Sequence, residues 1–170
     1  MPLLKIIYYI FVNIFSVPPK FQMRIMPTPI FDFLPQFKQH HLVLLSKSDG
    51  VYSIDFTPVE DRRRIKTSFK MFLGKNVKGE IRIRYVKGST LWEEDKIITA
   101  ICEKPFSENE SRALTNTIHN SIKDKQIKNF VDNLIEWKKD KNQTMNLYIR
   151  NCQHFSRYAE KILPCDIEKL

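Results

Sequence analysis

The residue in this sequence best suited to nucleophilic chemistry is Cys152. An apolar stretch, MNLYI, precedes it and a helical pattern begins at it, so its sulfur is expected to face the amide groups and positive dipole end of a first helical turn. That environment favours the thiolate and lowers the pKa of a cysteine from about 8.5. The pattern predicts an activated nucleophile or, as for most single cysteines, a small apolar side chain at a helix start.

A thiolate nucleophile works with an imidazole that takes and returns its proton, and with a third polar group that orients the imidazole. His40 begins one predicted strand and Asp55 ends the next, so antiparallel pairing brings the two to the same end of the sheet. His41 is expected on the opposite face, because successive side chains of a strand alternate. The competing interpretation is two edge histidines and a surface aspartate.

Two strings, NLYIRNCQHFSRY and HHLVLLSKSDGVYSIDFTP, resemble the nucleophile motif and the histidine hairpin of the lecithin:retinol acyltransferase-like family. This family is a circularly permuted, NlpC-type branch of the papain-like thiol enzymes. The order is also similar, with the histidine first, an orienting residue on the next strand, and the cysteine far downstream. The resemblance runs from Gln39 to Leu163 and implies Cys152 as nucleophile, His40 as base and Asp55 as orienting residue.

Two features depart from the family pattern. The hairpin turn is longer, and Asp55 stands where a second histidine is expected. The longer turn leaves His41 open as an alternative base. The resemblance implies acyl transfer through a thioester, with a lipid ester or amide favoured as substrate, a peptide or isopeptide as the alternative, and neither a metal nor an organic cofactor. The alternative from another class is a catalytically silent binding or interaction module of the same fold.

The elements that must position these residues are predicted from periodicity. The hairpin is followed by EIRIRYV, which alternates charged and apolar residues and predicts a strand with a cationic face. Further strands are expected at Ile97 to Cys102 and at Met145 to Ile149. A capping box predicts a helix start at Ser107, and apolar residues from Ile127 to Ile135 share one face of a second helix. The final helix is expected to run from Cys152 to Leu163. The predicted class is α+β, a permuted papain-like domain with a small antiparallel sheet packed on helices.

The folded domain is expected to span residues 37–170, preceded by an apolar and proline-rich segment at 1–36. The apolar run from Leu3 to Val17 is short for a membrane span, which needs roughly 20 residues. A helix packed on the domain or on a membrane surface, a short anchor, and a cleaved signal all remain open for it. The expected location is the cytoplasm or an organelle interior, with membrane association through this segment as an option.

The net charge of +9 in 170 residues favours anionic partners such as lipid headgroups or nucleic acid. Ten basic residues and one acid lie between Arg62 and Lys87, without a glycine-aromatic RNA-binding signature or a helix-turn-helix. A solvated basic face that touches an anionic membrane is therefore favoured over nucleic acid. The three cysteines, Cys102, Cys152 and Cys165, match no disulfide framework and no paired-ligand zinc site. Nothing in the sequence indicates an oligomeric state.

Overall fold

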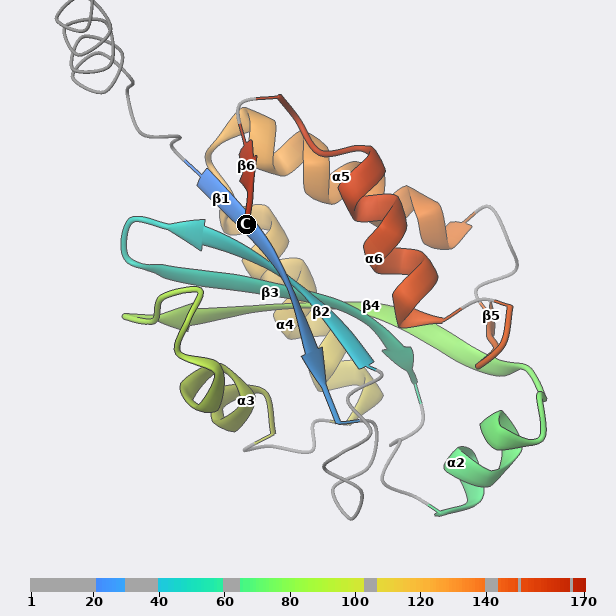
Figure 1. Cartoon of the computed structure of the whole chain (residues 1–170). Coiled ribbons are helices and arrows are strands. Elements are labelled where there is room, and N and C mark those ends of the chain that lie inside the picture. The colour runs from blue at the N-terminus through green and yellow to red at the C-terminus, as the bar shows by residue number, and fades with distance from the viewer. Residues whose placement is uncertain are drawn as a thin grey trace, which may run out of the picture.

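The computed structural model describes residues 21–29, 40–59, 65–102, 107–139, 144–149, 151–165 and 167–170. This part of the chain is a mixed α+β fold in which helices pack around a curled six-stranded sheet (Figure 1). The strands are β1 (Phe21–Thr28), β2 (His40–Lys47), β3 (Gly50–Pro58), β4 (Val77–Lys87), β5 (Thr144–Met145) and β6 (Ile167–Lys169). The five helices are α2 (Ile65–Phe72), α3 (Glu94–Cys102), α4 (Glu108–Ser121), α5 (Lys125–Lys139) and α6 (Cys152–Lys161).

The strand order across the sheet is β5-β4-β3-β2-β1-β6, and all neighbours are antiparallel except β1 and β6. The expected hairpin is confirmed as β2 and β3, which pair from Val43–Ile54 to Lys47–Gly50. Its two central strands carry the candidate histidines and aspartate.

The folded unit begins earlier than the boundary expected at residue 37. β1 pairs with β2 from Met23 to Thr28, and Phe21 and Met23 are buried in the core. Pro27 is tolerated because β6 pairs with β1 over Phe21 to Met23, so that the rest of β1 lies at a sheet edge. The expectations for Leu3 to Val17 lie outside the described residues.

Both faces of the central strands are buried, and each face has its own apolar core. On one face Val43, Leu45, Ile54 and Phe56 pack with residues of α5 and α6. On the other, Leu42, Leu44, Met26 and Val51 pack with Leu91 and with Ile97 of α3. Neighbouring residues of β2 therefore face different helices, which decides where each histidine points.

One strand predicted from the sequence is wrong, and another is shorter than expected. The residues from Ile97 to Cys102 belong to helix α3, which begins with Glu94 and Asp95 at its positive dipole end. A short run rich in isoleucine suits a buried strand and a helix equally, and periodicity alone does not separate them. The strand expected at Met145 to Ile149 ends at Met145, and a turn follows.

The helix predictions are confirmed. Ser107 caps α4, its side chain accepting the N–H of Glu110 while the Glu110 carboxylate accepts the N–H of Ser107. The buried face of α5 holds Ile127, Phe130, Val131 and Leu134, as the periodicity predicts. The last helix, α6, begins at Cys152 and ends at Lys161, two residues earlier than expected.

The strand from the basic alternating stretch forms as β4, but its cationic face is not free. Arg82 Nε lies 2.6 Å from Glu80 Oε1, and Arg84 Nη1 lies 2.9 Å from Asp55 Oδ1. Helix α4 packs against β4, where Thr115 Oγ1 accepts the backbone N–H of Ile83. Within the described residues, no helix combines the length and the hydropathy that a membrane crossing requires.

Candidate active site

Cys152 occupies the first turn of α6, at the position that the sequence predicts. Asn151 caps this helix, and its Oδ1 accepts the backbone N–H groups of Gln153 at 2.9 Å and His154 at 3.1 Å. Cys152 lies on the same side of the helix as Phe155 and Ala159, which pack on the sheet, and it is 3% exposed. The thiol therefore points inward, at the positive end of the α6 dipole.

His40 and Asp55 meet, as the hairpin register predicts. The distance from His40 Nε2 to Asp55 Oδ2 is 3.1 Å, and each side chain is 4% exposed. The other carboxylate oxygen of Asp55 accepts a hydrogen bond from Arg84 Nη1. A buried network of an imidazole, a carboxylate and a guanidinium thus joins β2, β3 and β4.

The Asp55 carboxyl is held in its ionised form. Burial would raise its pKa, but the Arg84 guanidinium, the His40 hydrogen bond and the nearby Arg82 outweigh that effect and hold the pKa well below its usual range. A carboxylate in this state accepts the Nε2–H of His40 and fixes the orientation of the ring.

His41 points to the other side of the sheet and contacts α6. Its Nδ1 lies 2.9 Å from Ser156 Oγ, and the Ser156 hydroxyl donates to the carbonyl of Gln153 at 3.0 Å. Because the hydroxyl proton is used in that second bond, Ser156 Oγ accepts from His41 Nδ1–H. The basic lone pair of His41 is therefore on Nε2, which forms no hydrogen bond within the part of the chain described.

The pKa of His41 is lowered from its ordinary value of 6.5, first by burial and then by the nearby Arg157. Glu160 opposes this shift. The imidazole is therefore neutral near pH 7, which is the form that accepts a proton.

The sheet separates the candidate residues into two groups. His40 and Asp55 lie on the face that Leu42, Leu44 and α3 share, whereas α6 packs on the face of Val43, Leu45 and His41. The structure thus brings His40 and Asp55 together, and it brings His41 onto the helix that begins with Cys152. Ser156 lies one helical turn after Cys152.

Sequence reasoning missed Ser156 and Arg84. Ser156 has a detectable signal, because it follows Cys152 by four residues and so shares its side of the helix. Arg84 had no such signal, because its contact with Asp55 depends on the register between β3 and β4, in which Asp55 pairs with Arg82 and Ser53 with Arg84.

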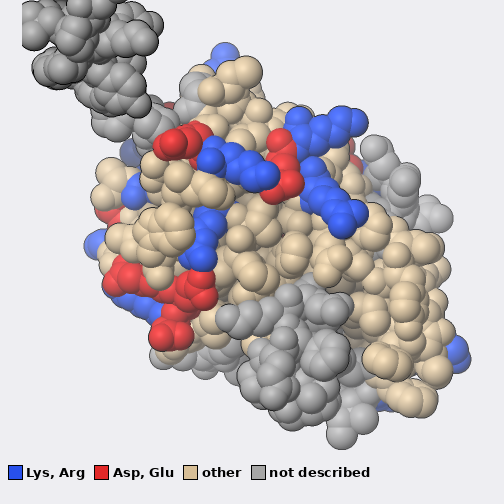
Figure 2. Space-filling model, viewed as in Figure 1, with Lys and Arg blue, Asp and Glu red and all other residues tan. Residues whose placement is uncertain are grey.

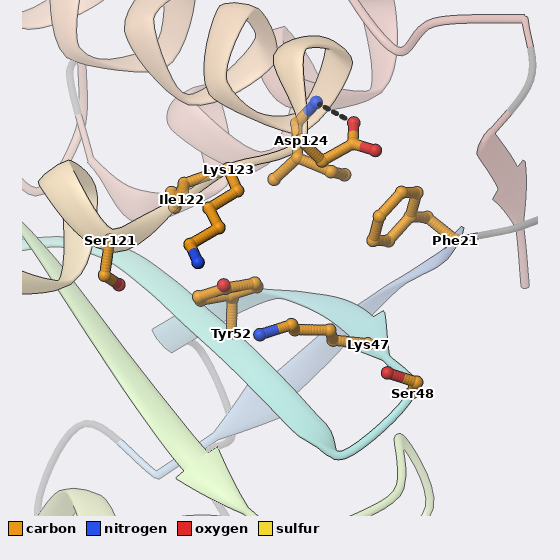
Figure 3. Close-up of a pocket in the computed structure, with 9 residues that line it drawn as sticks. Phe21, Lys47, Ser48, Tyr52, Ser121, Ile122, Lys123 and Asp124 are labelled. Carbon is orange, nitrogen blue, oxygen red and sulfur yellow. Dashed lines mark hydrogen bonds between the residues drawn. The ribbon is translucent and has the colours of Figure 1, made fainter.

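A cavity of about 530 Å³ lies at the opposite end of β2 from His40, between the β2–β3 turn and the loop from α4 to α5 (Figure 3). The Phe21 and Tyr52 rings and the Lys47 and Lys123 side chains line it. Because β2 is eight residues long, roughly 3.3 Å per residue, this cavity is too far from Cys152 to hold the reacting group of a substrate.

Within the described residues, no cluster of histidine, cysteine, aspartate and glutamate side chains is arranged to hold a metal ion. Comparison of the chain with family models, with curated proteins and with solved structures finds no match. The interpretation of the site therefore depends on its own geometry.

Proposed function

We propose that this protein is a cysteine-dependent acyl hydrolase or acyltransferase of permuted papain-like fold that acts through a thioester at Cys152. The observation that supports it most is the hydrogen bond between His41 of β2 and Ser156 of α6. Ser156 lies one helical turn after Cys152, and this bond orients the neutral imidazole of His41. A thiol at a helix start, an imidazole with its lone pair on Nε2 and a group that fixes its tautomer are the parts that thiol catalysis needs.

The reaction has two steps. Nε2 of the base accepts the proton of Cys152, and the thiolate attacks the carbonyl carbon of an ester or amide. The carbon–oxygen or carbon–nitrogen bond breaks, and the leaving alcohol or amine takes the proton from the imidazolium. Water or an acceptor alcohol or amine then gives a proton to the base and attacks the thioester, which releases the product and the thiolate. The amide of Cys152 and a neighbouring donor are the expected oxyanion site.

Of the two histidines, we propose His41 as the base, because it lies on the face that α6 covers. His40 and Asp55, which the sequence resemblance implies as base and orienting residue, then form a polar network that positions β2 from the opposite face. The alternative assignment keeps His40 as base with Asp55 as its partner, and mutation separates the two.

The experiment uses an activated ester, such as p-nitrophenyl acetate, followed by acid quench and mass spectrometry of peptides. We expect an acetyl adduct on Cys152 that is absent from the Cys152→Ser variant. His41→Gln is expected to slow adduct formation about 100-fold or more, the usual contribution of a general base, whereas His40→Gln slows it less. A larger effect of His40→Gln transfers the role of base to His40.

The catalytically silent module is favoured by the burial of Cys152, which is 3% exposed. Labelling by iodoacetamide near pH 7 distinguishes the two functions, with the exposed thiol of Cys165 as an internal control. An activated Cys152 reacts faster than Cys165 despite its burial, and His41→Gln slows Cys152 alone. If Cys152 reacts more slowly than Cys165 and no ester adduct forms, the enzymatic proposal fails and the interaction module stands.

A further inference from the structure

A group of large apolar side chains is exposed beside the start of α6. They come from the end of α2 and from the turn that precedes α6, and their exposed fractions lie between 56% and 73%: Phe69, Phe72, Leu73, Tyr148 and Ile149. Single exposed apolar residues are ordinary on protein surfaces, but a contiguous group marks a contact site.

The two segments are joined by hydrogen bonds into one surface. Tyr148 Oη donates to the carbonyl of Phe72, and the side-chain amide of Asn146 donates to the carbonyl of Gly74 and to Asn76 Oδ1. Asn146 Oδ1 accepts the backbone N–H groups of Tyr148 and Ile149. The exposed side chains of Tyr148 and Ile149 therefore lie on a turn that hydrogen bonds hold in place.

Lysines accompany these apolar side chains. On α2, Lys66, Phe69 and Lys70 recur at helical spacing, and Leu73 continues the series just after the helix, while Thr67 and Met71 are buried. Lys75 follows and is exposed. The segments 65–79, 144–149 and 151–159 contain no aspartate or glutamate. Figure 2 shows that the right-hand side of the molecule, over α2 and the turn before α6, is nearly free of charged side chains, with blue at its margin.

We propose that this surface, formed by the five apolar side chains and Lys66, Lys70 and Lys75, docks on an anionic phospholipid bilayer. Phenylalanine, leucine, tyrosine and isoleucine insert into the boundary between headgroups and acyl chains. The lysine ammonium groups reach the lipid phosphates, and their aliphatic stems lie along the apolar surface. The charge pattern selects an anionic bilayer, because the lysines have no neighbouring carboxylate within these segments to neutralise them.

Docking in this way places the start of α6 at the bilayer. Asn151, which caps α6, also donates from Nδ2 to the carbonyl of Leu147 in the docking turn. Cys152 thus lies three residues from Ile149, at the edge of the docking surface. That a lipid ester reaches Cys152 from the bilayer rests on the proposed function, whereas the docking itself does not depend on a reactive thiol.

The experiment measures how the full chain partitions onto sedimented vesicles of phosphatidylcholine, alone or with about 30 mol% phosphatidylglycerol, which gives the bilayer a strongly negative surface. We expect binding to the anionic vesicles that salt weakens. Neutralising Lys66, Lys70 and Lys75 to Gln is expected to lower the partition coefficient by about 100-fold, close to fivefold per lysine. The matched control neutralises three lysines elsewhere, Lys123, Lys125 and Lys161, and changes the net charge equally.

A second variant replaces Phe69, Phe72 and Leu73 by Ser, and we expect it to lose binding to the anionic vesicles at any salt. Because that change can disturb α2, a Phe69→Trp variant gives an independent readout: its emission shifts to the blue on anionic vesicles and is quenched by brominated lipid, beyond the change seen in the wild type. Cys152→Ser is expected to bind as the wild type does, which separates docking from catalysis.

Three results overturn the proposal. The first is an equal loss of binding in the docking-surface lysine variant and in the control lysine variant, which means that only the net charge matters. The second is unchanged binding of the variant with serine at positions 69, 72 and 73, which assigns membrane contact to another part of the chain. The third is that the wild type does not bind vesicles but self-associates in sedimentation velocity, and that the variant with serine at positions 69, 72 and 73 does not self-associate. That result assigns the surface to a second copy of the chain.

Discussion

Replacement of Asp55 by Asn removes the negative charge from the network that joins β2, β3 and β4, with almost no change in shape. The carboxylate makes two charge-assisted contacts, at 2.9 Å to Arg84 and 3.1 Å to His40, and all three side chains are mostly buried. A hydrogen bond to a charged group contributes about 1.5–3 kcal/mol, and breaking a buried pair costs about 3–5 kcal/mol because the remaining charge stays buried. We expect Asp55→Asn to lower the free energy of unfolding by about 3–5 kcal/mol.

The same substitution changes the dependence of stability on pH. Because the pKa of Asp55 is lower in the folded chain than the unfolded value of about 3.9, its contribution is complete above that value and is lost as the pH falls below it. The variant lacks this contribution at every pH, so its stability is expected to fall less steeply than that of the wild type below pH 4.

Urea denaturation at pH 7 measures the effect as a shift of the midpoint at constant slope. Asp49→Asn on the same hairpin is the matched control, since its contact with Lys47 is exposed, and it is expected to change stability little. Arg84→Met completes a double-mutant cycle, in which the double variant should be more stable than the sum of the single effects predicts. A loss below about 1 kcal/mol for Asp55→Asn, or additivity within about 0.5 kcal/mol, refutes the network as a stabilising contact.

Three further predictions concern the site and its supports. The imidazole of His41 should titrate below 6.5 in histidine NMR spectra of the folded chain, and a midpoint above that value contradicts its burial. In thermal denaturation, Asn151→Ala should lower the free energy of unfolding by about 1 kcal/mol, because two backbone N–H groups lose their acceptor. Asn151→Ser keeps a capping oxygen and should cost less in the same measurement. Gly79→Ala should cost about 1–3 kcal/mol, because its Cβ would lie 2.4 Å from Cζ of the buried Phe56 ring; recovery is expected in combination with Phe56→Leu, and a neutral Gly79→Ala in urea denaturation is inconsistent with this packing.

The parts of the fold that the sequence predicts well are those specified locally. Ser107 and Glu110 form the capping box that their spacing indicates, and Asp49 and Gly50 mark the hairpin. The start of α6 follows from Asn151, because asparagine is one of the residues preferred at a helix N-cap. Such signals need no knowledge of distant residues.

The parts that the sequence could not give depend on tertiary contacts. Ile97, Ile98 and Ile101 fit a strand or a helix, and their burial against Leu91 decides for the helix. The strand β1 lies in a proline-rich stretch, where local propensity opposes pairing, and the core beneath Met23 favours it. The pairing of Asp55 with Arg84 depends on the register between β3 and β4. The pairing of His41 with Ser156 depends on which helix covers which face of the sheet, and strand alternation alone leaves that open.

The cover that α4 gives to β4 has a consequence for how this domain can recognise other chains. A strand with unoccupied backbone donors and acceptors invites an incoming peptide to extend the sheet, and the hydroxyl of Thr115 fills such a position opposite Ile83. At the far side β6 occupies the beginning of β1, and Pro27 offers no donor on the remainder. Within the described residues, these contacts hinder strand addition beside Ile83 and along β1. A Thr115→Val change is expected to leave the backbone N–H of Ile83 without this acceptor and to favour unwanted strand pairing and aggregation.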